Sequence, residues 1–211
     1  MTKGQKALLL IVVVLVVDQI SKILVKTNMQ LYEFFSVAGD WFYIRYLENS
    51  GMAFGWKFAG VSGKVFLTLF RIVASIFIGW YIFKLLKKDT SLGVILGVSL
   101  VFAGAVGNII DSTVYGLIFD TGTVFNTEYG GWMSYRGVSS LNFQGYSSVF
   151  QGCVVDMLHF PIIDTFFPDW MPMVGGQKFV FFSPIFNIAD SAITVGVAYL
   201  ILFQRSFFKN I

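Results

Sequence analysis

Four long apolar runs constrain this sequence more than any other feature. A helix that crosses a bilayer needs about 20 predominantly apolar residues, and four runs approach or reach this length, at residues 7–25, 65–83, 92–111 and 185–203. The composition agrees, because 56% of the residues are hydrophobic and only 13% are charged, whereas soluble domains carry about 25% charged residues. The sequence therefore predicts an all-α membrane protein, a four-transmembrane-helix bundle that forms one domain over residues 1–211.

Basic residues predict how the four spans are oriented. Lysine and arginine favour the cytoplasmic side of a membrane, and here they gather in the two terminal tails and in the turn between the second and third runs. These residues are Lys3, Lys6, Lys84, Lys87, Lys88, Arg205 and Lys209. With an even number of spans, all three segments lie on one side, so both termini are expected to be cytoplasmic. Segments 26–64 and 112–184 are then the outer ones.

The two outer segments have different patterns. The first contains an aromatic, β-branched stretch that ends in Asn49-Ser50-Gly51, which is typical of a strand followed by a turn. We therefore expect a small extracytoplasmic β-sheet on the membrane surface. The second is an extended outer loop, and its first part, residues 112–155, is rich in glycine and serine. That composition predicts a mobile flap over a functional site, with an adventitious solvent loop as the alternative.

Polar residues gather toward the outer ends of the apolar runs. Asn187 and Asp190 lie three residues apart near the start of the fourth run, which places Asp190 about 7–8 Å below the outer surface. An aspartate in a membrane span costs about 2.5–3.5 kcal/mol and is functional by default. The sequence places further charged and amide side chains at similar depth or in the adjoining loop, namely Asp18, Lys22, Asn108, Asp111 and Asp156.

Each of these charged residues also has an ordinary structural interpretation. Asp18 and Lys22 are spaced i, i+4 and could form an ion pair on a helix surface. Asp111 could be an interfacial residue at a helix end, and Asp156 an ordinary loop aspartate. Asp190 could be buried against Lys22 or Arg71, although its depth favours a functional role.

The residue inventory excludes several kinds of chemistry. The only cysteine, Cys153, cannot form an intramolecular disulfide, and the only histidine, His159, excludes zinc sites that need two or three imidazoles. A Cys153–His159 thiol dyad and a Ser21–Lys22 hydrolase are both disfavoured by their spacing. Two aspartates that share one proton remain, and such a pair can carry out acid–base peptide hydrolysis. A proton or ion pathway and a purely structural subunit are the competing functions; no nucleic-acid binding is indicated.

Five motifs, taken in order, resemble one family, lipoprotein signal peptidase, also called signal peptidase II. The resemblance extends from residue 18 to the end of the fourth run. The motifs are DQISK at 18–22, NSGMAFG at 49–55, GAVGNIID at 104–111, VVDML at 154–158 and FNIADSAI at 186–193.

The resemblance implies an aspartic endopeptidase of the bacterial cytoplasmic (inner) membrane, with its active site near the outer face. It implies cleavage of diacylglyceryl-modified prolipoproteins immediately before the lipidated cysteine, with Asp156 and Asp190 as the catalytic pair and a water held between them. Prolipoproteins and membrane lipids are the implied partners, and we expect a monomer without cofactor or metal. The implied substrate-binding residues are Asn49, Gly51, Asn108 and Asn187, and the implied structural supports are Asp18, Lys22 and Asp111.

One position departs from the family pattern. Members usually carry arginine directly after the GNxxD motif, where this sequence has Ser112. In the family that arginine contacts the substrate, so another cation would have to take over this role here. Arg71 and Arg136 are the candidate replacements.

Overall fold

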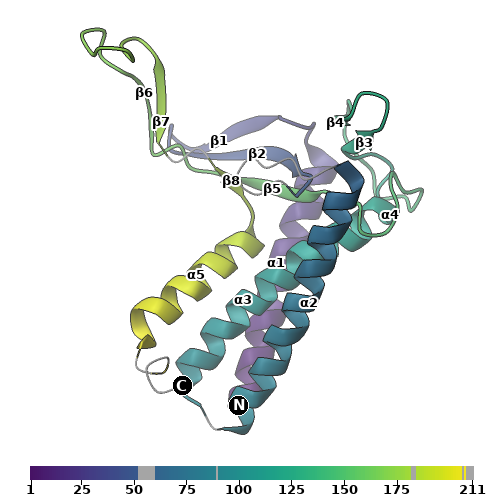
Figure 1. The fold of residues 1–211 in the computed structure, drawn as a ribbon, viewed down its shortest axis with the longest axis vertical. Helices are drawn as coiled ribbons and strands as arrows, with labels where there is room; N and C mark the ends of the chain where they lie inside the picture. The colour runs from purple at the N-terminus through teal and green to yellow at the C-terminus, as the bar shows by residue number, and fades with distance from the viewer. Residues whose placement is uncertain (52–59, 89, 182–183, 206, 208–211) are drawn as a thin grey trace.

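Three long apolar helices stand side by side and form the body of the molecule (Figure 1). The computed structural model describes residues 1–51, 60–88, 90–181, 184–205 and 207, so residues 52–55 of the second motif lie outside the described residues. The helices are α1 (Lys3–Asn28), α2 (Gly60–Lys87) and α3 (Leu92–Ile110). Within the described residues, three helical segments are long and apolar enough to cross a membrane, the third being α3 with its continuation to Ile118.

The fourth helix, α5 (Ile188–Phe203), is shorter and begins later than the sequence predicted. Its 16 residues span about 24 Å at 1.5 Å per residue, against about 30 Å for a hydrocarbon core. The predicted span began at residue 185, but Ile185–Phe186 form strand β8. Asn187 is extended and caps the helix: its side chain accepts the backbone N–H of Asp190, and the Asp190 carboxylate accepts that of Asn187. This reciprocal capping box determines where the helix starts.

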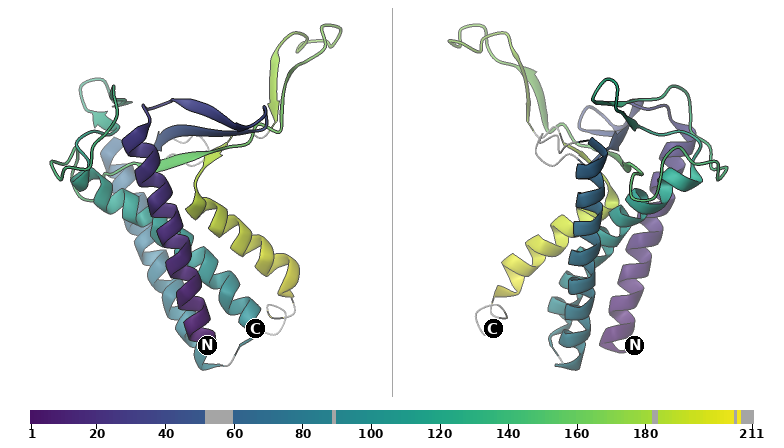
Figure 2. Two further views of the ribbon diagram at one scale, coloured as in Figure 1. Left: turned by 180° about the vertical axis from the view of Figure 1, so that it is seen from behind. Right: turned by 45° about the vertical axis from the view of Figure 1, so that its right-hand side comes forward.

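A four-stranded antiparallel sheet lies across one end of the helices, which we call the sheet end (Figures 1 and 2). Its strands are β1 (Phe34–Ala38), β2 (Phe42–Asn49), β5 (Val154–His159) and β8, in the order β1-β2-β5-β8. The prediction of a small sheet is therefore confirmed. The N-terminal end of α1 and the C-terminal end of α5 both lie at the opposite end of the molecule (Figure 2).

Two hairpins extend the sheet end. Strands β3 (Val124–Asn126) and β4 (Gly131–Met133) form one, within the glycine- and serine-rich segment. Strands β6 (Ile163–Phe166) and β7 (Lys178–Phe181) form the other, which projects away from the helices (Figure 1).

Both ends of the glycine- and serine-rich segment are packed against the rest of the molecule. The segment continues α3 through a π-helical turn η1 (Asp111–Tyr115) and α4 (Gly116–Ile118), and the Gly152 N–H returns to donate to the Ser112 carbonyl at 3.1 Å. A Cβ at Gly152 would collide with the backbone of Asp111 and Gly116, so only glycine permits this approach. These contacts hold the two ends of the segment, and the mobile flap stays a prediction.

The crossing of α3 and α5 sets the position of the polar residues at the sheet end. Gly104 lies so close to the Ala189 carbonyl that any Cβ at that position would overlap it. Small residues allow helices to approach in this way within a membrane. One turn after Gly104, α3 therefore presents Asn108 to the first turn of α5.

Candidate active site

Asp156 and Asp190 are brought together by the pairing of β5 with β8. Asp156 lies in β5, and the ladder pairs Leu158 with Phe186, so the chain that follows β8 passes beside Asp156 into α5. Asn187 contacts both carboxylates. Its side-chain Nδ2 donates to Asp156 Oδ1 at 2.7 Å, and its backbone N–H donates to Asp190 Oδ2 at 3.4 Å.

Two further asparagines complete a frame around the aspartates. Asn49 Nδ2 donates to Asp156 Oδ2 at 3.2 Å, and Asn108 Nδ2 donates to Asp190 Oδ1 at 2.8 Å. Asn187 also donates to Asn108 Oδ1 at 3.2 Å. The three asparagines predicted for the site thus lie together, and each one donates to at least one of the two carboxylates.

Gly51 orients the first of these amides. It adopts a φ of 95°, a conformation that favours glycine. Its N–H donates to Asn49 Oδ1 at 2.9 Å. This bond occupies the amide oxygen and directs the Nδ2 group of Asn49 toward Asp156.

The two aspartates differ in their environments. Asp156 is 2% exposed, whereas Asp190 is only half-buried. Burial raises the pKa of Asp156 to about 7, with a further increase from the negative charge of Asp190. Hydrogen bonds from Asn49 and Asn187 and the charge of Lys22 act in the opposite direction. Around neutral pH, Asp156 can therefore retain a proton beside a more accessible Asp190.

A buried cluster of three charged residues lies beside the site aspartates. Lys22 Nζ lies 2.9 Å from Asp18 Oδ2 and 2.8 Å from Asp111 Oδ2, and all three side chains are 0% exposed. Its third donor reaches Asn108 Oδ1 at 3.0 Å. The predicted i, i+4 pair of Asp18 and Lys22 is present, but it is buried and not on a helix surface, because α1 packs against α3. Asp111 lies at the C-terminal end of α3, as expected, and it is buried as well.

Each carboxylate of this ion cluster accepts a hydrogen bond from a backbone N–H next to one of the site aspartates. The Ala189 N–H donates to Asp18 Oδ1 at 2.8 Å, and the Val155 N–H donates to Asp111 Oδ2 at 3.2 Å. The Asp18 contact also places a negative charge at the N-terminus of α5, where the helix dipole favours it. The ion cluster thus sets the backbone on both sides of the site.

Gln19 joins this ion cluster, although sequence reasoning gave it no role. Its Nε2 lies 3.0 Å from both Asp18 Oδ2 and Asp111 Oδ1, and its Oε1 accepts the Tyr115 hydroxyl at 3.1 Å. An amide within an otherwise apolar helix, directly after Asp18, was the signal that could have identified it.

The replacement for the missing family arginine is not apparent from contacts in the described part of the chain. Ser112 is buried and donates to the Asn108 carbonyl at 3.0 Å. Arg71 is half-buried on α2 and Arg136 is exposed, and within the described residues neither makes a hydrogen bond or an ion pair. Both remain predictions.

The geometry argues against a Cys153–His159 thiol dyad. Cys153 directly precedes β5 and His159 ends it, so about 20 Å separates them at 3.3 Å per residue. The thiol is buried and donates to the Thr123 carbonyl. Burial raises the pKa of the Cys153 thiol to about 12, which disfavours the reactive thiolate.

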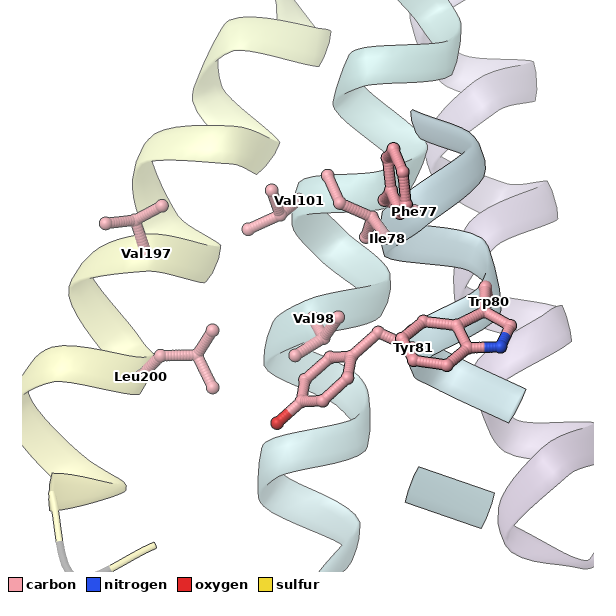
Figure 3. A pocket seen from close by; sticks show the side chains of 8 residues that line it. All are labelled: Phe77, Ile78, Trp80, Tyr81, Val98, Val101, Val197 and Leu200. Carbon is pink, nitrogen blue, oxygen red and sulfur yellow. The ribbon is translucent and has the colours of Figure 1, made fainter. Parts of the chain in front are cut away.

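An apolar groove lies farther along α5, between this helix and helices α2 and α3 (Figure 3). Its volume is about 450 Å³. Val197 follows Asp190 by seven residues, so it lies two turns, or about 10 Å, farther along the same helix face. The groove and the aspartates are therefore aligned along α5. The lining residues are Phe77, Ile78, Trp80, Tyr81, Val98, Val101, Val197 and Leu200.

Comparison with known proteins identifies relatives along nearly the whole chain. The sequence model of the family described as Signal peptidase (SPase) II matches residues 10–206. The lipoprotein signal peptidase of Porphyromonas gingivalis is 43% identical over 203 residues, which cover 95% of this chain and 83% of that protein. The lipoprotein signal peptidase of Amoebophilus asiaticus is 38% identical over 194 residues, covering 90% of this chain and 74% of that protein.

Solved structures share the fold. A bacterial membrane enzyme solved at 1.9 Å resolution is 26% identical, with a TM-score of 0.57 over 94% of this chain and 91% of that chain. A second bacterial membrane enzyme, solved at 2.3 Å resolution, has a TM-score of 0.58 at 22% identity and covers 98% of this chain and 91% of that chain.

Proposed function

Because the chain belongs to the signal peptidase II family, we propose that it removes signal peptides from diacylglyceryl-modified prolipoproteins by a two-aspartate mechanism. Cleavage occurs immediately before the lipidated cysteine. The observation that carries the mechanism is the asparagine frame, in which Asn187 donates to both Asp156 and Asp190. The different burial of the two carboxylates supports an assignment of one acid and one base.

The proposed reaction begins with a water held between the two carboxylates. Asp190 takes a proton from this water while the water oxygen attacks the scissile carbonyl carbon. Protonated Asp156 donates its proton to the carbonyl oxygen. The resulting gem-diol then collapses: a hydroxyl proton returns to Asp156, the C–N bond breaks, and Asp190 gives its proton to the leaving nitrogen. Both aspartates finish in their starting protonation states, and no covalent bond forms between the substrate and the protein.

The amide groups around the aspartates suit an unwound peptide substrate. A peptide bond at membrane depth costs several kcal/mol when its N–H and C=O groups lack partners. Asn49, Asn108 and Asn187 carry both donors and acceptors at the site, and we assign them to the substrate backbone and to positioning the pair.

The apolar groove is the proposed path of the signal peptide helix. Signal peptides carry an apolar region of about 7–15 residues before the cleavage site, which is about 10–22 Å of helix. A helix lying in the groove would end near Asp190. The substrate's acyl chains would stay in the surrounding lipid.

This function requires a defined orientation in the membrane. The relatives and the apolar helices support a bacterial membrane protein. We propose that α5 is the fourth span, that both termini are cytoplasmic, and that the sheet end faces outward. The short α5 would then begin below the outer surface, so Asp190 would be reached from the sheet end.

The mechanism predicts that cleavage slows as pH rises above neutrality. The reaction needs a proton on Asp156, whose pKa is about 7, so kcat/KM should be halved near pH 7 and should fall about tenfold for each further pH unit. Asn49→Ala removes a hydrogen bond that lowers this pKa. The fall in kcat/KM on the alkaline side of the pH–rate profile, its alkaline limb, should therefore move to higher pH. The measurement is a pH–rate profile with a diacylglyceryl-modified prolipoprotein.

A matched control for the pH profile is Asn28→Ala, which changes an exposed asparagine at the end of α1. Its alkaline limb should coincide with that of the wild type. Activity that stays constant to pH 9 in the wild type would contradict the assignment of Asp156 as the acid.

The groove assignment predicts a change in substrate affinity. Val197→Trp fills the groove, and helices in a bilayer associate chiefly through packing, so KM for a prolipoprotein should rise about tenfold, equivalent to about 1.4 kcal/mol, with little change in kcat. Val195→Trp is the control, because Val195 is exposed on α5 and does not line the groove. Equal KM values for the two variants would rule the groove out as the signal-peptide site.

A further inference from the structure

A second buried lysine, Lys26, lies one helical turn beyond Lys22 on α1 and is also 0% exposed. Its Nζ pairs with Glu48 Oε1, donates to the Thr121 carbonyl at 2.9 Å and lies 3.3 Å from the Tyr46 hydroxyl. The ammonium therefore contacts α1's neighbours in two places: strand β2 and the segment that follows α4.

Aromatic rings enclose this lysine. Lys26 Nζ lies 5.0 Å from the ring centre of Phe119 and 5.2 Å from those of Tyr135 and Tyr146. All three rings belong to the segment after α3. Rings at this distance stabilise a cation that has been removed from water, so the segment provides a large part of the lysine's environment.

Both carboxylate oxygens of Glu48 accept hydrogen bonds in addition to the ion pair with Lys26. Its Oε1 accepts the Tyr46 hydroxyl at 2.7 Å, and its Oε2 accepts the Thr123 N–H at 2.6 Å. The Tyr135 hydroxyl lies 2.8 Å from that of Tyr46. We call this set the Lys26 clamp; its members are Lys26, Tyr46, Glu48, Phe119, Thr121, Thr123, Tyr135 and Tyr146.

The Lys26 clamp and the active site use opposite faces of one strand. Side chains alternate along β2, so Tyr46 and Glu48 face the clamp whereas Leu47 and Asn49 face the other side. The ladder pairs Leu47 with Asp156 and Glu48 with Val155. Asn49, which donates to Asp156, is therefore the neighbour of Glu48 along the strand.

We propose that Lys26 and Glu48 are positioning residues for peptide cleavage. By tying β2 to α1 and to residues 119–146, they hold the Asn49 amide at hydrogen-bond distance from Asp156. The glycine- and serine-rich segment then serves as a support for the catalytic strands. This inference rests on the proposed role of Asp156.

The inference predicts an effect on rate and on the pH profile together. Glu48→Gln and Lys26→Met should each lower kcat about tenfold to a hundredfold, because small displacements of catalytic groups have effects of this size. KM should change little. The alkaline limb should move to higher pH, as for Asn49→Ala, because Asp156 loses the hydrogen bond that lowers its pKa.

The pH readout separates positioning from stability. The charges with the largest effects on the pKa of Asp156 are Asp190 and Lys22, and neither is changed in these variants. A role in folding alone would reduce the amount of active protein and leave the limb in place. Glu128→Gln is the matched control, because it makes the same substitution at an exposed site of the glycine- and serine-rich segment.

Removal of a single charge from a buried pair can prevent folding. In that case the Lys26→Met/Glu48→Gln double variant removes both charges, which is often tolerated, and the same shift of the limb is expected. Wild-type kcat and an unmoved limb in the folded variants would overturn the inference. Asp156→Asn is assayed alongside these variants. If Asp156→Asn is inactive, only the positioning role of the Lys26 clamp is overturned. If Asp156→Asn is active, the proposed two-aspartate mechanism is overturned as well.

Discussion

Asp156→Asn and Asp190→Asn are each expected to abolish cleavage while the protein still folds. General acid or base catalysis contributes roughly 10²–10⁴-fold to a rate, and residues that act as one unit lose most of their effect when either is removed. We therefore expect each single variant and the double variant to fall to a similar residual level, about a hundredfold to ten-thousandfold below wild type. Asparagine keeps the size of the side chain and one oxygen that can accept from Asn187.

The assay should compare purified wild type and variants on a diacylglyceryl-modified prolipoprotein, with thermal unfolding measured for each. Asp40→Asn is a suitable control, because it makes the same substitution at an exposed aspartate of the sheet end. Cleavage that persists in a folded Asp156 or Asp190 variant would exclude that residue from catalysis. An ion flux that is lost in the same variants, without any proteolysis in the wild type, would instead favour the pathway function.

Of the variants proposed for this protein, Lys22→Met is expected to lower the free energy of unfolding most. It leaves Asp18 and Asp111 buried without their shared cation, and breaking a buried ion pair in this way costs about 3–5 kcal/mol. That is a large part of a typical unfolding free energy of about 5–15 kcal/mol. At about 2–4 °C per kcal/mol, Tm should fall by roughly 6–20 °C.

Two variants make the stability prediction specific. Lys6→Met makes the same change at an exposed position of α1 and should leave Tm within about 1–2 °C of wild type. The triple variant Asp18→Asn/Lys22→Met/Asp111→Asn removes the buried charges together and should recover part of the lost stability. A Lys22→Met protein that unfolds with wild-type Tm would show that the ion cluster contributes little to folding.

Much of the fold follows from local patterns in the sequence. The apolar runs at 7–25, 65–83 and 92–111 lie within or largely overlap the three long helices, and the aromatic, β-branched stretch before Asn49 forms β2. The fourth helix was predicted with its start three residues too early. The reason is that Ile185 and Phe186 are as apolar as the helix itself, so only strand pairing and the Asn187 cap distinguish them.

Only some residues of the candidate site could be predicted from the sequence. Resemblance to a known family pointed to the aspartates and asparagines, and the structure places these residues in one frame. Gln19, Lys26 and Glu48 were missed because their partners lie in distant parts of the chain. The Gly- and Ser-rich composition of residues 112–155 also did not reveal that Tyr135 and Tyr146 of this segment pack around a buried lysine.

The sequence by itself determined the apolar helices and the strand before Asn49, because each depends on residues within a few positions of one another. Tertiary structure decided which charges meet and which are buried. Lys22 lies between Asp18 and Asp111 only because α1 packs on α3, and Asp156 lies beside Asp190 only because β5 pairs with β8. The raised pKa of Asp156 depends on that burial and on its neighbour's charge, both of which are consequences of packing between distant segments.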